Sequence, residues 1–167
     1  MVTLDKLRYT KCPTFNAPQV TTYGFEMESR AQLVDNLYLE NNLGHTHSEI
    51  NRFQDLITGA NYQGNPVPFV PEFNATTALQ YKHPQGYFIR TEWLWKGKTY
   101  FDETKSAALS QNDYSLFNVR VGYSKQAYSV YLYADNLGDN YYYTSKIGVR
   151  GVLGNPRVVG AQLSVSF

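Results

Sequence analysis

The sequence lacks several features that would identify a class of protein directly. Its 167 residues include one cysteine, Cys12, which excludes an intramolecular disulfide framework and a cysteine-rich metal site. The 15 lysine and arginine residues nearly balance the 14 aspartate and glutamate residues, so charge points neither to nucleic acid nor to an acidic partner. No apolar run reaches the roughly 18 residues of a membrane-spanning helix, which excludes transmembrane helices.

Targeting and catalytic motifs are also missing. The N-terminus, MVTLDKLRYTKCP, lacks the basic start, apolar core and cleavage site of a secretory signal. We therefore expect either an intracellular protein or a fragment or mature portion of a longer one. The sequence contains no Gly-x-Ser-x-Gly elbow, phosphate-binding loop or His-Glu-x-x-His motif. This pattern predicts a protein that is not an enzyme and holds no cofactor.

Aromatic residues, by contrast, are abundant. The chain has 15 tyrosines, 9 phenylalanines and 2 tryptophans, or 16% of its residues, with a mean hydropathy of −0.44. That hydropathy is too low for a helical membrane protein. A transmembrane β-barrel is compatible with it, because only every second residue of a barrel strand must be apolar.

The last segment, Arg157–Phe167, shows the clearest periodicity. One face would carry apolar residues and the other small or polar residues, in strict alternation: Val159, Ala161, Leu163, Val165 and Phe167 against Gly160, Gln162, Ser164 and Ser166. A period of two over so many residues indicates a β-strand and does not fit a helix.

Similar alternation recurs upstream. It predicts strands within Phe25–Gln32, Leu37–Gly44, Phe73–Lys82, Tyr87–Lys96, Phe117–Ser124 and Val130–Asp135, with a weaker eighth strand in Val2–Tyr9. The predicted fold is all-β: an antiparallel meander of about 7–8 amphipathic strands, with residues 1–167 as one domain. Such a meander suits the last section of a transmembrane β-barrel or a small reclosed barrel.

The connections between these segments alternate in length. Long gaps are expected at Thr10–Thr22, Glu49–Pro71, Gly97–Asp113 and Asp139–Pro156, and tight turns at Val34–Asn36, His83–Gly86 and Ser124–Ala127. Outer-membrane barrels have this rhythm, with short periplasmic turns and long external loops. A lectin-like sandwich would reproduce only part of it.

Charged residues in the middle of the strands leave two interpretations open. They are Glu26, Glu28, Arg30, Glu40, Lys82, Arg90, Glu92, Arg120 and Asp135. In a soluble sandwich they would form the solvated outer faces, whereas in a barrel they would line the lumen. Aromatic residues gather near the strand ends, as in the two interfacial girdles of a barrel in lipid, which favours the barrel.

Several segments, in this order, resemble TonB-dependent outer-membrane receptors. They are Tyr23–Glu28 (YGFEME), Asn42–Thr46 (NLGHT), Gly64–Pro66 with Pro71–Asn74, Tyr114–Tyr123 (YSLFNVRVGY), Ser129–Asp139 (SVYLYADNLGD) and Pro156–Phe167 (PRVVGAQLSVSF). The Asn-Leu-x-Asp-x-Tyr element at Asn136, Leu137, Asp139 and Tyr141 is among the family's recognisable marks. Together these segments extend over nearly the whole chain.

The resemblance implies a bacterial outer-membrane protein. Members of this family have a barrel of about 22 strands filled by an N-terminal plug, and they import ferric siderophores, cobalamin or similar scarce ligands with energy from TonB. At roughly ten residues per strand plus loops, 167 residues match only the last seven or eight strands. The plug, the TonB-interacting segment and a signal peptide have no counterpart here. We therefore expect a partial barrel domain, inactive in transport when isolated, whose partners are the rest of the receptor, its plug and outer-membrane lipid.

The C-terminal strand resembles the signal read by the barrel assembly machinery. An amphipathic strand that ends in an aromatic residue has open backbone groups for pairing, and its apolar side chains would supply specificity. The expected signal residues are Val159, Ala161, Leu163, Val165 and Phe167. The alternative is that Phe167 is only an interfacial aromatic residue.

A metal site is a minor alternative. His45, His47 and Glu49 lie two residues apart on one predicted strand face, a spacing compatible with metal ligation. Because they continue the Leu39–Leu43 face at the outer end of a strand, an interfacial or solvated set of side chains is the preferred interpretation.

External loops commonly carry recognition residues. In the last long loop, aromatic and basic residues would suit an anionic ligand such as a ferric siderophore: Tyr141, Tyr142, Tyr143, Lys146 and Arg150. Phe53 and Tyr62 belong to another exposed loop. The alternative is that these loops bind nothing.

Three functions remain open from the sequence. The preferred one is the barrel portion of a TonB-dependent receptor, and the second is a small, self-contained outer-membrane barrel with a structural or adhesive role. The third is a soluble β-sandwich that acts as a binding module.

Overall fold

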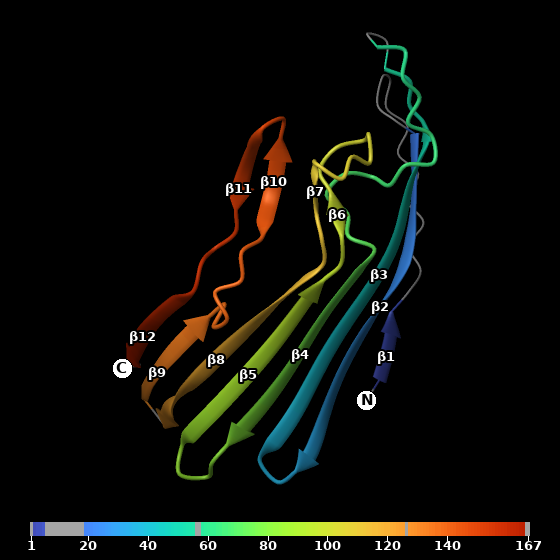
Figure 1. The fold of residues 1–167 in the computed structure, drawn as a ribbon. Helices are drawn as coiled ribbons and strands as arrows, with labels where there is room; N and C mark the ends of the chain where they lie inside the picture. Colours follow the sequence, from blue (N-terminus) through green and yellow to red (C-terminus); the bar gives the residue numbers. More distant parts are fainter. Residues whose placement is uncertain (1, 6–18, 56–57, 126, 166–167) are drawn as a thin grey trace.

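The computed structural model describes residues 2–5, 19–55, 58–125 and 127–165 (Figure 1). Its strands are β1 (Val2–Asp5), β2 (Gln19–Val34), β3 (Leu37–Arg52), β4 (Phe73–Lys82), β5 (Tyr87–Lys96), β6 (Thr99–Tyr100), β7 (Ser110–Gln111), β8 (Tyr114–Lys125), β9 (Tyr128–Asp135), β10 (Tyr143–Ile147), β11 (Arg150–Leu153) and β12 (Val158–Val165). Within the described ranges, no helix is long and apolar enough to cross a membrane.

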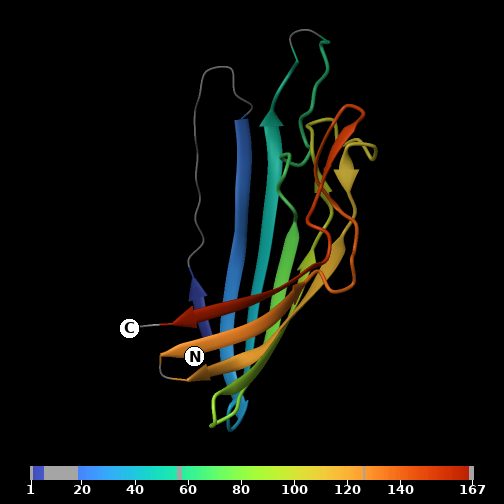
Figure 2. The ribbon, with the colours of Figure 1, turned by 90° about the vertical axis from the view of Figure 1, so that its left-hand side faces the viewer.

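Eight of these strands form one sheet in the order β1-β2-β3-β4-β5-β8-β9-β12, with every neighbouring pair antiparallel. The sheet is curved, and the β1 and β12 edges do not pair with each other among the described residues (Figures 1 and 2). The predicted antiparallel meander is therefore confirmed, as an open barrel section. Over the residues that the structure describes, the sheet does not close into a small barrel.

The connections separate by length to opposite ends of the sheet. Figure 1 shows the tight turns β2–β3, β4–β5 and β8–β9 at one end, and the longer loops at the other. Asn36 in the first turn has a φ of 64°, a left-handed conformation that asparagine adopts more readily than most residues. Gly86 has a φ of 105° in the second. For the described connections after β2, the predicted alternation of short turns and long loops is confirmed, and most of the expected gap Thr10–Thr22 lies outside the described residues.

The pairing between β2 and β3 continues beyond the alternating residues, so both strands are longer than predicted. Val20 pairs with Ile50 and Thr21 with Glu49, so the strands cover parts of the expected gaps Thr10–Thr22 and Glu49–Pro71. The other two gaps contain short hairpins, β6–β7 and β10–β11. The predicted strand Val2–Tyr9 is seen as β1, and Lys6–Tyr9 lies outside the described residues.

The register joins the apolar residues of successive strands into one continuous face, here called the apolar face. One row runs Val121–Leu132–Ala161 across β8, β9 and β12. Within the described part of the chain, no second layer covers these side chains, and Leu132 remains 58% exposed. A sandwich would bury this face against a second sheet, so the β-sandwich alternative does not describe this fold.

Polar residues on the apolar face satisfy each other. Asn41 and Thr77 are cross-strand partners, and the Thr77 hydroxyl donates to Asn41 Oδ1 at 3.0 Å. A pair of this kind costs less in an apolar environment than two unpartnered groups.

Candidate functional site

The opposite side of the sheet, here called the polar face, carries a network of ion pairs. Arg90 on β5 donates to Glu40 Oε2 on β3 at 2.7 Å and to Glu92 Oε2 at 3.2 Å. Arg30 on β2 lies 3.4 Å from the other oxygen of Glu40. The Arg90 side chain reaches Glu40 across β4, where Ala78 pairs with both Glu40 and Glu92 and is only 2% exposed. A small residue at this position leaves room for the bridge.

The network continues toward the C-terminal strands. Asn118 on β8 donates to Glu92 Oε1 at 3.3 Å and accepts the backbone N–H of Asn136 at 2.9 Å. Polar contacts therefore cross the wall from β2 to the end of β9. Because the carboxylates face guanidinium and amide donors, this arrangement suits a rigid polar lining and offers no free acid–base pair.

The Asn-Leu-x-Asp motif forms a hydrogen-bonded turn after β9. Asn136 is 3% exposed, and its side-chain amide donates to the carbonyls of Asn140 and Asn155 at 3.0 and 3.1 Å. Its Oδ1 accepts the Asn140 N–H at 2.9 Å, while Asp139 Oδ1 accepts the Arg157 N–H at 2.9 Å. The motif therefore ties the end of β9 to the segment that leads into β12, a role that the sequence did not reveal.

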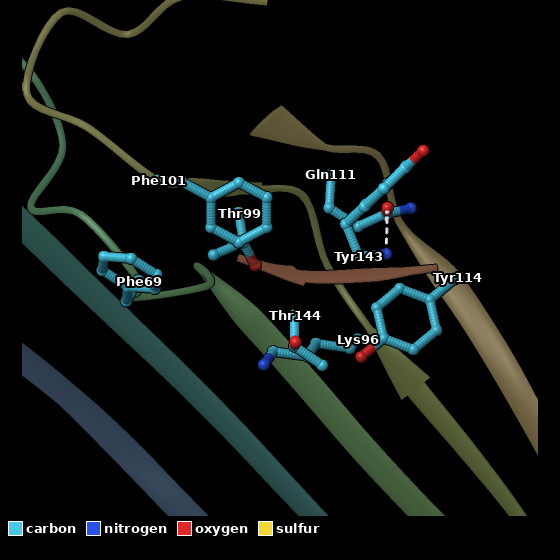
Figure 3. A pocket seen from close by; sticks show the side chains of 8 residues that line it. All are labelled: Phe69, Lys96, Thr99, Phe101, Gln111, Tyr114, Tyr143 and Thr144. Atoms are coloured by element: carbon cyan, nitrogen blue, oxygen red, sulfur yellow. Dashed lines mark hydrogen bonds between the residues drawn. The ribbon is translucent and has the colours of Figure 1, made fainter. Parts of the chain in front are cut away.

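The β10–β11 hairpin contacts the β6–β7 hairpin at the loop end, and Figure 3 draws the hydrogen bond between Tyr143 and Gln111. The Lys146 ammonium donates to the Ser110 carbonyl at 2.8 Å and lies 4.4 Å from the centre of the Tyr143 ring. The Tyr143 N–H donates to Gln111 Oε1 at 2.8 Å. These contacts hold the two hairpins together.

The same cluster extends to the loop between β3 and β4. The Phe69 N–H donates to the Tyr100 carbonyl at 2.8 Å, and the Phe69 and Phe101 rings lie 5.5 Å apart. Asn65 donates to the Glu103 carbonyl at 2.8 Å. Three loops far apart in sequence therefore form one assembly, here called the loop cap.

The cavity inside the loop cap is small. It measures about 30 Å³ and is lined by Phe69, Lys96, Thr99, Phe101, Gln111, Tyr114, Tyr143 and Thr144 (Figure 3). A space of this size holds about one water molecule. A ligand larger than this would not fit inside that cavity.

The residues predicted to contact a ligand divide into two groups. Tyr142 stacks on Tyr114 at 4.4 Å, and Tyr143 and Lys146 make the contacts above, so these three hold the cap together. Tyr141, at 78% exposure, and Arg150 are open to solvent.

The other predicted loop pair lies apart from the β10–β11 hairpin. Phe53 and Tyr62 face each other at 5.5 Å in the loop after β3. In the described part of the chain, no hydrogen bond or ring contact joins this pair to the hairpin.

The histidines of the predicted metal alternative lie among aromatic rings on the apolar face. The His45 ring is 5.5 Å from Phe25 and 4.5 Å from Phe73, and its Nε2 lies 3.8 Å from Glu72 Oε1. A second set of contacts surrounds His47, which lies 4.8 Å from the Tyr23 ring and 3.6 Å from Glu49 Oε2. Among the residues that the structure describes, no three potential ligands group as a metal site.

The predicted assembly strand is an edge of the sheet. β12 pairs along its length with β9. The side chains of Val159 and Leu163 are 72% and 69% exposed, and Ala161 and Val165 lie on the same face. Phe167 lies outside the described residues.

A wide hollow lies at the short-turn end. It measures about 590 Å³ and is lined by Gln80, Lys82, His83, Pro84, Gly86, Tyr87, Phe88, Ser124, Lys125, Ser129 and Tyr131. Tyr131 is held there by a hydrogen bond from its hydroxyl to Gln162 Oε1 at 2.6 Å. None of the lining residues is acidic.

These features define a wall section of a membrane-spanning β-barrel: one curved antiparallel sheet, an uncovered apolar face, a polar face with paired charges, and long loops confined to one end. The TonB-dependent receptor-like β-barrel model matches residues 5–137. The chain therefore belongs to the TonB-dependent receptor family.

Solved structures agree with this assignment. The chain is 25% identical to the ferric yersiniabactin uptake receptor FyuA of Yersinia pestis, with a TM-score of 0.74 over 91% of the chain and 24% of that receptor. The siderophore receptor PiuA of Acinetobacter baumannii is 20% identical, with a TM-score of 0.73 over 98% of the chain and 24% of PiuA. The copper transporter OprC is 15% identical, with a TM-score of 0.68 over 90% of the chain and 24% of OprC.

The chain thus spans about a quarter of the length of the structures that it matches. The family consists of transport receptors of the bacterial outer membrane, and the predicted location in that membrane is confirmed. At 15–20% identity, PiuA and OprC show the fold alone, and their names show that this fold serves both siderophore and copper transport.

Proposed function

We propose that the chain forms part of the barrel wall of a receptor that imports ferric siderophores or similar scarce ligands through TonB-dependent transport. The family match over residues 5–137 carries this proposal. The 25% identity to a ferric yersiniabactin uptake receptor favours an iron complex as cargo. On this proposal the chain is not an enzyme, and as an isolated segment it does not transport.

The outer surface of the loop cap is the proposed ligand-facing region. Arg150 and Tyr141 are exposed there and can supply a cation and a ring to an anionic iron complex. Lys146 already donates to Ser110, so its role would be to hold the hairpin. Phe53 and Tyr62 form a separate aromatic pair that a larger ligand could reach.

The polar face is the proposed boundary with the plug and the rest of the receptor. Its central charges are already paired within the wall, as Arg90 with Glu40 and Glu92 shows. A plug can lie against such a surface without leaving many unpaired buried charges, which are costly.

Assembly into the outer membrane would use β12. Its unpaired backbone edge can add a strand, and Val159, Ala161, Leu163 and Val165 supply an apolar pattern that leads to Phe167. The partner proposed for this edge is the barrel assembly machinery.

Uptake by cells tests the function. A strain without its own siderophore receptors would express the full-length protein that carries this segment, and ⁵⁵Fe uptake would be measured with catecholate, hydroxamate and citrate complexes. At least one iron complex should enter in a TonB-dependent way, and Arg150→Gln should weaken its binding about tenfold, since hydrogen bonds to charged groups contribute roughly 1.5–3 kcal/mol. If copper enters and none of these iron complexes does, the result would contradict the proposed cargo.

A matched control for Arg150→Gln is Lys105→Gln, another exposed cation of the loop cap. It should leave iron uptake unchanged. Equal losses in both variants would mean that overall charge attracts the ligand, and would contradict a specific role for Arg150.

A further inference from the structure

Aromatic rings line the apolar face where the strands reach the short turns. The distances between ring centres are 6.2 Å for Tyr81 and His83, 6.3 Å for His83 and Tyr87, and 5.1 Å for Tyr87 and Tyr123. Tyr128, 63% exposed, continues this row on β9. We call these five residues the lower ring belt. Rings of this kind suit the boundary between lipid and water.

A lysine lies beside this belt. Lys125 pairs with Tyr128 across the β8–β9 turn, and its Cβ would be 3.3 Å from a Cβ placed on Gly86, so it is next to the His83–Gly86 turn. Among the described residues, Lys125 makes no ion pair. The described parts of the three short turns contain one acid, Asp35, which lies in the β2–β3 turn. The Lys125 charge is therefore not neutralised by an ion pair or by an acid in the described parts of the adjacent turns.

His83 offers a hydrogen-bond donor to the same region. The Gln85 N–H donates to His83 Nδ1 at 3.2 Å. An Nδ1 that accepts a hydrogen bond carries no proton, so the ring proton of neutral His83 is on Nε2. His83 therefore presents an Nε2–H donor without needing to be charged.

We propose that Lys125 and His83 bind the phosphate of a phospholipid headgroup in the periplasmic leaflet, with Tyr87, Tyr123 and Tyr128 around it. The ammonium and the Nε2–H are donors that fit the single negative charge of a phosphodiester. The proposal rests on the outer-membrane location of the barrel and on the rule that short barrel turns face the periplasm.

The surface above the belt favours a lipid over a free anion. Ile89, Val121 and Leu132 lead away from it along the apolar face and are 44%, 48% and 58% exposed. Acyl chains can cover this apolar surface while the headgroup stays at Lys125. A free phosphate ion would leave it uncovered.

Lipid retention by the full-length protein tests this site. The protein would be purified in a neutral detergent and mixed with phosphatidylglycerol or phosphatidylcholine, and native mass spectrometry would count the retained lipids. Wild-type protein should prefer phosphatidylglycerol, because the choline group is repelled by Lys125. Lys125→Gln should reduce phosphatidylglycerol retention about fivefold, as expected for one lysine near an anionic surface.

Two further variants sharpen the test. His83→Asn keeps an acceptor for the Gln85 N–H and removes the Nε2–H donor, so it should also reduce retention. Lys98→Gln is the matched control, because Lys98 lies in the loop cap at the opposite end, 4.9 Å from the Tyr100 ring. Heat-dependent migration on a denaturing gel would verify that each variant is a folded barrel. If Lys125→Gln does not fold, the lipid retention of His83→Asn tests the site instead.

Several results would overturn the proposal: no preference between the two lipids, unchanged retention in both site variants, an equal loss in Lys98→Gln, or displacement of phosphatidylglycerol by millimolar inorganic phosphate. Iron uptake is a separate readout. A lipid preference without any iron uptake would contradict the proposed cargo and support the lipid site, whereas uptake without a lipid preference would do the reverse.

Discussion

The two faces of the sheet differ in the environment that their side chains require, although they share one backbone. On the polar face, Arg90 forms ion pairs with Glu40 and Glu92, and Ala78 is buried beneath this bridge. On the apolar face, Leu132 and Leu163 remain 58% and 69% exposed. A water-soluble sheet would bury the second face and hydrate the first. The comparison shows that the apolar face suits contact with lipid, and that the central charges of the polar face are already paired with one another.

The largest difference between the two faces is expected when a charged side chain is introduced on each of them. Leu132→Arg puts a guanidinium into the lipid-facing middle of β9, which costs about 2–4 kcal/mol near the bilayer midplane. Folding of the full-length protein into lipid vesicles, followed by heat-dependent gel migration, should show a large loss of folded barrel.

The matched control for that variant is Thr76→Arg on the polar face of β4. The new side chain would point toward the lumen, so folding should stay close to the wild-type level. Equal losses at Thr76 and Leu132 would contradict the assignment of the two faces.

Added volume should also affect the two faces differently. Ala78→Leu places a larger side chain under the Arg90–Glu40 bridge, and overpacking of this kind costs about 1–3 kcal/mol. Ala75→Leu on the same strand faces lipid and should be nearly neutral. Midpoints of urea unfolding in detergent would measure both, and a greater loss for Ala75→Leu would argue against a packed bridge.

Removing the central cation should have a smaller effect. Arg90→Gln leaves Glu40 and Glu92 without their shared donor, and we expect a loss of about 1–2 kcal/mol, because hydrogen bonds to charged groups contribute roughly 1.5–3 kcal/mol and this pair is partly solvated. The same urea midpoints apply. If Arg90→Met proved more stable than wild type, the bridge would not stabilise the wall.

Arg30→Gln should have the smallest effect. The Arg30 side chain is 60% exposed and its contact with Glu40 is 3.4 Å. Exposed ion pairs contribute about 0–1 kcal/mol and weaken with salt. The difference between Arg30→Gln and wild type should therefore shrink as NaCl is raised, and a difference that grows with salt would exclude an ionic contribution.

Much of the wall could be predicted from the sequence, because alternation is local. Val130, Leu132 and Ala134 share a face whatever their neighbours are. The sequence placed Ile50 in the expected gap Glu49–Pro71, but Ile50 belongs to β3, where it has the parity of the polar face and is 1% exposed. The loop after β3 folds back beside it, since the Ile50 N–H donates to the Asn65 carbonyl and the Ile50 carbonyl accepts from the Gly64 N–H. Such packing depends on residues outside the strand.

The candidate sites were harder to predict because their contacts join distant segments. The sequence placed Glu40, Arg90 and Glu92 on a charged lining, but their pairing depends on the register across β4. Lys146 looked like a ligand contact, whereas it donates to Ser110 in another loop. The two-residue strands β6 and β7 are too short for any period to reveal.

Accessibility along β9 tests the two faces most directly. With Cys12 replaced by serine, single cysteines at residues 129–134 of the full-length protein would carry a fluorophore in lipid vesicles, with quenchers dissolved in lipid or in water. Labels at Val130, Leu132 and Ala134 should be quenched from lipid, and those at Ser129, Tyr131 and Tyr133 should not. Quenching that lacked this two-residue period, or that followed the opposite parity, would contradict the barrel wall described here.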